Sequence, residues 1–136
     1  MVSSLQSRLK QTIVSLLTAK LADVGISTKI VYLFGSYASG TATSESDIDI
    51  AVLGNKKTPS LARWKIQSEL ADALGFDVDL VDLLCASTVM QNQIIHHGLC
   101  LYETENSAAL FEMQIMSMYQ HLNDERADIL AQFIKG

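Results

Sequence analysis

Residues 34–53 read FGSYASGTATSESDIDIAVL, a glycine-serine turn followed after ten intervening residues by an Asp-x-Asp pair. Residues 29–34 are β-branched and aromatic, which predicts a strand that runs into the turn. Asp47 and Asp49 stand at the start of a second apolar run, and side chains two residues apart share one face of a strand. The spacing therefore predicts a polar turn and two carboxylates at the same end of one sheet.

A third acid completes a candidate metal site. Two carboxylates on one face repel each other and raise each other's pKa, unless a cation such as Mg²⁺ lies between them. The next predicted strand offers Asp79, which we prefer to Asp77 on the same face because apolar residues flank it, whereas Asp82 points to the opposite face. With this third acid, Asp47 and Asp49 could hold two metal ions, as in phosphoryl-transfer centres.

The Gly35-Ser36 turn is the candidate phosphate site. Glycine lets a phosphate approach the backbone, successive N–H groups form a concave anion site, and the serine hydroxyl adds a donor. The lysine of a P-loop is absent, so metal ions would have to neutralise a triphosphate. Tyr37 and the Lys56-Lys57 pair could touch a nucleotide, although a solvated loop also accounts for them.

Helical and strand patterns intermix along the chain. We expect helices over residues 3–24, 60–74, 88–97 and 105–134, and strands over residues 29–34, 48–53, 76–83 and 99–102. This order predicts an α/β (α+β) class, with flanking helices around a small mixed sheet of about four strands. The length predicts a single domain, 1–136. Its helical segment from about residue 105 is a candidate partner-binding surface because it is rich in methionine, and burial against the sheet is the alternative.

Composition narrows the function classes. The net charge of −5, without a basic cluster, disfavours direct nucleic-acid binding. No apolar run reaches the ~20 residues of a membrane-spanning helix and no signal peptide is visible, so we expect no membrane contact and a cytoplasmic location. We expect Cys85 and Cys100 to be buried thiols and Trp64 to lie in the core. The adjacent His96 and His97 project in different directions, which disfavours a zinc pair.

The combination of Gly35-Ser36, Asp47-Ile48-Asp49 and Asp79 resembles the nucleotidyltransferase superfamily related to DNA polymerase β. The short chain resembles its minimal branch, the MNT-domain antitoxins that are paired with HEPN-domain toxins in prokaryotes. The resemblance covers about residues 10–103. It implies a polymerase β palm-like nucleotidyltransferase fold.

The resemblance also assigns roles to the motif residues. It implies that Asp47 and Asp49 bind both Mg²⁺ ions, and that Asp79 binds the catalytic ion and helps activate the acceptor hydroxyl. Gly35-Ser36 would bind the triphosphate of ATP. Many relatives have Arg in the loop where this chain has Ser39.

The implied reaction is attack of an acceptor hydroxyl on the α-phosphorus of ATP, with loss of pyrophosphate. Larger relatives carry a further domain for the acceptor, and this chain has no residues left for one. We therefore expect a Mg²⁺-dependent protein adenylyltransferase, an antitoxin that transfers AMP to a tyrosine of its HEPN ribonuclease partner. The alternatives are a small-molecule nucleotidyltransferase of the aminoglycoside-modifying type and a non-enzymatic module that occludes the toxin.

Overall fold

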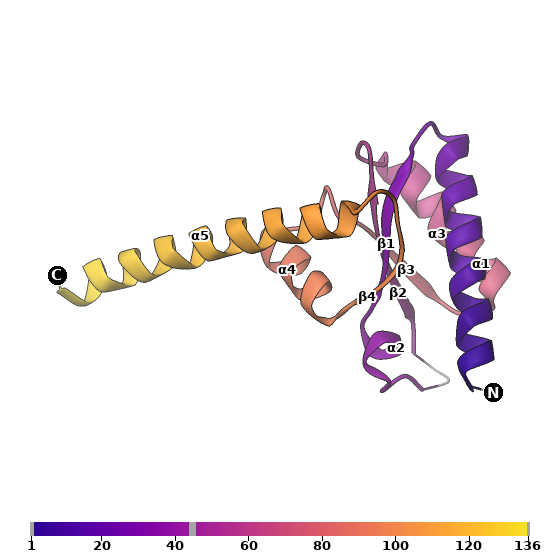
Figure 1. The fold of residues 1–136 in the computed structure, drawn as a ribbon, viewed down its shortest axis with the longest axis horizontal. Helices are drawn as coiled ribbons and strands as arrows, with labels where there is room; N and C mark the ends of the chain where they lie inside the picture. Colours follow the sequence, from indigo (N-terminus) through magenta and orange to yellow (C-terminus); the bar gives the residue numbers. More distant parts are fainter. Residues whose placement is uncertain (1, 44–45, 136) are drawn as a thin grey trace.

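The computed structural model describes residues 2–43 and 46–135, and side chains within residues 7–43 and 46–132. Its elements in chain order are α1 (Val2–Asp23), β1 (Thr28–Phe34), α2 (Ser36–Ser39), β2 (Ile48–Gly54), α3 (Ser60–Leu74), β3 (Val78–Asp82), α4 (Thr88–His97), β4 (Leu99–Glu103) and α5 (Ser107–Lys135). The strands form one sheet in the order β3-β2-β1-β4, and β1 is antiparallel to both β2 and β4 while β2 is parallel to β3. This mixed sheet with flanking helices confirms the predicted class (Figure 1).

Helices cover both faces of the sheet. One core cluster joins α1 and α3 to the strands and contains Leu17, Leu70, Ile48 and Ile50. A second cluster, on the opposite face, joins α4 and the start of α5 to the strands. Because alternate residues of a strand point to opposite faces, the burial of Ile48 and Ile50 beneath α1 and α3 sends the residues between and before them to the other face. That alternation sets the direction of the acidic side chains.

Only the first part of helix α5 packs against the core. Phe111 and Ile115 are buried against the second core cluster, and the hydroxyl of the buried Tyr32 donates to Oε1 of Glu112 at 2.8 Å. Beyond this contact the helix projects away from the body, where residues 123–132 are all exposed (Figure 1). Its 29 residues span ~43 Å. Burial against the sheet, the alternative to a partner-binding surface, therefore applies only to one face of the first half of the helix.

Two expectations about the core are wrong. Trp64 is 60% exposed because α3 turns Ile66 and Leu70 toward the sheet and leaves the tryptophan, like Leu61, on its outer face. Cys85 and Cys100 are exposed free thiols instead of buried ones. Cys85 lies in the turn after β3, and Cys100 lies on β4, which is an edge strand. Among the described residues, no helix is long and apolar enough to cross a membrane.

Candidate active site

The three candidate carboxylates lie on one face of the sheet. Asp49 and Asp79 occupy paired positions on the parallel strands β2 and β3, and Asp47 directly precedes β2. Their apolar neighbours in the strands are buried beneath α1 and α3, so the three acids face the side of α4 and α5. Asp49 is half-buried, whereas Asp47 and Asp79 are exposed. The strands thus bring together residues that are 30 positions apart in sequence.

Electrostatics couple the three acids. Burial raises the pKa of Asp49 above its ordinary value, and the charges of Asp79 and Asp47 raise it further. Within residues 2–43 and 46–135, no three acidic, histidine or cysteine side chains are already grouped closely enough to hold a metal ion. The donor set nevertheless fits Mg²⁺, which takes carboxylate together with phosphate oxygens, and a divalent cation would offset the repulsion at Asp49.

Gly35 is in close contact with the acidic pair. Its neighbour Phe34 pairs with Asp49 across β1 and β2, and its own backbone has φ 74° and ψ −152°, a region that other residues avoid. A Cβ atom at Gly35 would lie 2.1 Å from Oδ2 of Asp49. Glycine is therefore required here both for the backbone conformation and for space. The turn and the carboxylate form one compact unit at the end of β1.

The helical turn α2 follows directly and closes the loop. The N–H groups of Ala38 and Ser39 both donate to the Gly35 carbonyl at 3.1 Å. The hydroxyl of Ser39 donates to the Ser36 carbonyl at 3.2 Å and lies 2.8 Å from Oγ1 of Thr41. Ser39 is thus held within the loop by its own hydrogen bonds. Gly35 and Ser36, at the start of α2, are the loop residues beside the carboxylates.

Other residues singled out from the sequence lie elsewhere or have structural contacts. The Tyr37 ring packs edge-on against Phe76, with ring centroids 6.1 Å apart, and contacts the core beneath α1 and α3. The Lys56-Lys57 pair follows the opposite end of β2 from the acids. Asp82 is only 3% exposed and accepts hydrogen bonds from the backbone N–H groups of Thr58 and Leu84, at 2.8 and 3.0 Å. These contacts explain the residues without a catalytic role.

The structure also adds candidate site residues that the sequence pattern did not reveal. A cavity of about 340 Å³ lies beside Asp79, and Arg63 from α3, Cys85 from the following turn and Met90 from α4 line it. These residues come from separate elements, so no local spacing indicates that they meet. Their common neighbour is β3, which is an edge strand and leaves this side of Asp79 open. The candidate site therefore extends from the acids toward α3 and α4.

Comparison with known proteins agrees with this geometry. The family model described as polymerase beta, nucleotidyltransferase matches residues 18–107. The protein adenylyltransferase MntA of Shewanella oneidensis is 48% identical over 102 residues, which cover 75% of this chain and 73% of the relative. This chain therefore belongs to the polymerase β nucleotidyltransferase family.

Within that family, this chain is similar to solved structures of toxin-antitoxin proteins. A crystal structure of a toxin-antitoxin with AMP-PNP has a TM-score of 0.79 and 42% identity, and the match covers 92% of this chain and 98% of that one. A structure of the tri-AMPylated Shewanella oneidensis HEPN toxin in complex with MNT antitoxin has a TM-score of 0.77 and 39% identity, and the match covers 95% and 98%. The similarity to MntA and to these complexes confirms the MNT resemblance drawn from the motif.

Proposed function

We propose that this protein is an antitoxin that acts as a protein adenylyltransferase, transferring AMP from ATP to a tyrosine hydroxyl of a HEPN-domain toxin. One observation carries the proposal: the pairing of Asp49 with Asp79, beside the Gly35 turn, occurs in a chain 48% identical to the adenylyltransferase MntA. The paired carboxylates are suited to nucleotidyl transfer, and the activity of the relative supports a protein as the acceptor.

The site residues divide the work between nucleotide and acceptor. Gly35 and Ser36 bind the triphosphate through backbone N–H groups and the serine hydroxyl. Asp47 and Asp49 would hold two Mg²⁺ ions and Asp79 one of them, and the ions would supply charge neutralisation at the phosphates. The phenolic oxygen forms a bond to the α-phosphorus, the bond from that phosphorus to the bridging oxygen breaks, and pyrophosphate leaves. The phenolic proton is lost to Asp79 or to water.

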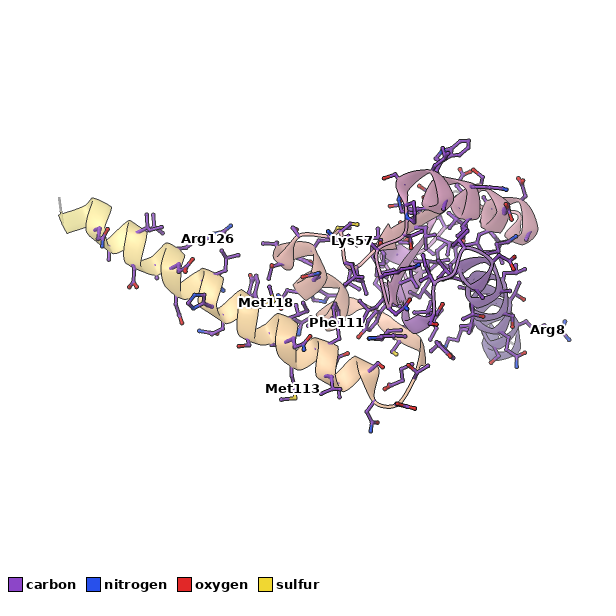
Figure 2. The ribbon with its side chains drawn as sticks, turned by 90° about the horizontal axis from the view of Figure 1, so that it is seen from above. Arg8, Lys57, Phe111, Met113, Met118 and Arg126 are labelled. Atoms are coloured by element: carbon purple, nitrogen blue, oxygen red, sulfur yellow. The ribbon has the colours of Figure 1, made fainter. Side chains whose placement is uncertain are left out.

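The projecting part of α5 is the proposed docking surface for the toxin. The apolar stripe that packs on the sheet at Phe111 and Ile115 continues at helical spacing to Leu122. Ile129 lies on the same side of the helix, after the charged Glu125 and Arg126. Figure 2 shows Phe111 where α5 meets the body, Met118 farther along the helix and Arg126 on its free part.

The exposed apolar residues of α5 include Leu110, Met113, Met116, Met118, Ile129 and Leu130. Asp124, Glu125 and Asp128 outnumber Arg126 on the free part of the helix, so the stripe has an acidic flank. Ile129 and Leu130 lie on the projecting part and the other four lie nearer the body, and exposed apolar residues that recur along one helix are typical of a binding site. The partner surface that fits it is an apolar groove with a basic rim.

Transfer is tested with purified proteins. The antitoxin, ATP, Mg²⁺ and the toxin encoded beside it are incubated, and intact-mass and peptide spectrometry should find AMP on a toxin tyrosine. Asp47→Ala with Asp49→Ala should abolish this mass increase, while Asp77→Ala, which alters an acid outside β3, should retain it. Absence of AMP on a folded toxin contradicts the proposal. Full neutralisation of the toxin by the double variant identifies occlusion without chemistry instead.

A further inference from the structure

The cavity beside Asp79 lies outside the sheet, against the edge strand β3. It has a volume of about 340 Å³ and is bounded by the start of α3, the turn after β3 and α4. Ligand sites for drug-sized molecules range over roughly 300–1,000 Å³, so this cavity is at the lower end and suits a single ring better than a multi-ring antibiotic. Because it includes Asp79, a group seated in it is adjacent to the proposed catalytic carboxylates.

Side chains of α3 form hydrogen bonds with the backbone groups at the open edge of β3. The side-chain oxygen of Gln67 accepts from the Leu80 N–H at 2.9 Å, and a guanidinium nitrogen of Arg63 donates to the Leu80 carbonyl at 3.0 Å. An added peptide strand would need these same backbone groups, so β-augmentation is disfavoured at this edge. The arrangement favours insertion of a side chain into the cavity. It also holds the Arg63 guanidinium, which has five N–H donors, at the cavity wall.

We infer that this cavity receives the phenol ring of the acceptor tyrosine, with Met90 and Arg63 against the ring and Asp79 facing the hydroxyl. The inference rests on the proposed function and specifies where its acceptor binds. A thioether and a guanidinium are both favourable neighbours for an aromatic ring, through sulfur–aromatic and cation–π contacts. A carboxylate accepts a hydrogen bond from the phenol. The lining thus matches an aromatic alcohol better than an aliphatic or a cationic acceptor.

Two neighbouring residues of α4 provide a matched steric test. Met90 lines the cavity and is 37% exposed, whereas Val89 is 38% exposed and does not line it. Met90→Trp should fill the cavity and raise the KM for the toxin, or lower kcat/KM, by about 100-fold. The affinity of this variant for a fluorescent ATP analogue should stay within about twofold of the wild-type value. Val89→Trp should leave both quantities near wild type. Equal losses in the two variants, or full transfer by Met90→Trp, overturn the inference.

The two exposed cysteines give an independent test. Cys85 lines the cavity, and Cys100 lies on β4 at the opposite edge of the sheet. Partial desolvation, followed by the charge of Asp82 at Cys85 and of Glu103 at Cys100, raises the pKa of both exposed thiols, so a maleimide of aromatic size is coupled at mildly alkaline pH to the single-thiol variants Cys100→Ser and Cys85→Ser. Labelling Cys85 should block transfer to the toxin and leave ATP binding intact, and bound toxin should slow that labelling. Labelling Cys100 should change neither.

The outcomes separate this inference from the function on which it rests. If the wild-type protein places no AMP on the folded toxin, the proposed function fails. If the wild type transfers AMP but a label on Cys85 leaves the KM for the toxin unchanged, the function stands and the acceptor binds elsewhere. A further substitution, Arg63→Gln, should raise the KM for the toxin without changing that for ATP, and Arg63→Lys should restore part of the loss because it keeps the cation.

Discussion

Replacement of Gly35 by alanine tests the site most directly, because one added methyl group reaches a candidate catalytic carboxylate. The new Cβ would lie 2.1 Å from Oδ2 and 3.0 Å from Cγ of Asp49, whereas ordinary contact begins at 3.4 Å. The carboxylate therefore has to move by about 1.3 Å. A displacement of ~1 Å in a reacting group costs about 100-fold in rate, so we expect transfer to fall by about that factor or more.

The same substitution carries a backbone cost that can be separated from the clash. With φ 74° and ψ −152° at Gly35, a non-glycine residue costs about 1–3 kcal/mol. The melting temperature should fall by several degrees, since 1 kcal/mol shifts Tm by roughly 2–8 °C in domains of this size range. Gly75→Ala is the control because Gly75 has φ 75° and open space around it. It should lose about 1–2 kcal/mol and keep its transfer rate.

A double-mutant cycle isolates the contact with Asp49. In an Asp49→Ala background the carboxylate is absent and only a 3.3 Å contact with Cβ remains, so Gly35→Ala should cost little beyond its backbone strain. Thermal unfolding measures the stability cost in both backgrounds, and single-turnover AMP transfer compares Gly35→Ala with the wild type. A folded Gly35→Ala variant that transfers AMP at the wild-type rate would refute the placement of Asp49 in the reaction. An identical stability cost in both backgrounds would show that the clash contributes nothing.

Three further substitutions distinguish a catalytic acid from a structural one and test the hydrogen bond that anchors α5. Asp49→Asn should abolish transfer and leave the metal-free protein at least as stable as the wild type at neutral pH. Burial and the charges of Asp79 and Asp47 raise the pKa of Asp49 in the folded protein, so its ionisation lowers stability as the pH rises from about 4 through that raised pKa. Thermal melts between acid and neutral pH should show this loss in the wild type and not in Asp49→Asn. Asp82→Asn should cost about 1–3 kcal/mol in urea unfolding, because an amide cannot accept both backbone hydrogen bonds, while the folded variant keeps its KM for ATP; a large change in that KM contradicts the structural role. Tyr32→Phe should cost about 1.5–3 kcal/mol through the lost bond to Glu112, and an unchanged unfolding midpoint would show that this bond does not anchor α5.

Much of the fold was predictable because strand and helix periods leave clear local signals. The alternation of Asp47, Ile48, Asp49 and Ile50 predicts which side chains share a face, and the core beneath α1 and α3 follows that alternation. Gly75 ends α3 as expected, with the left-handed φ of 75° that favours glycine at a helix end. The order of strands in the sheet has no such local signal, since it depends on contacts between distant segments.

The incorrect expectations share a physical cause. Tryptophan and cysteine are usually buried, but burial depends on which helix face meets the sheet and on where the sheet ends. On α3 the apolar residues surround the helix, so only the packing on α1 and β3 decides that Trp64 faces outward. The same limit applies to Arg63 and Met90, which meet only because β3 is an edge strand. The sequence pattern therefore could not predict which side chains the order of the strands brings together.

The straight, projecting α5 also bears on selectivity. A helix of ~43 Å does not bend as a flexible linker does, so a toxin held on it would present only the hydroxyls that lie at a fixed distance and direction from Asp79. Tethering raises the effective concentration of those hydroxyls and lowers that of all others. Tyrosines would then be selected by their distance and direction from the docking site on the toxin surface. Their neighbouring sequence would matter little.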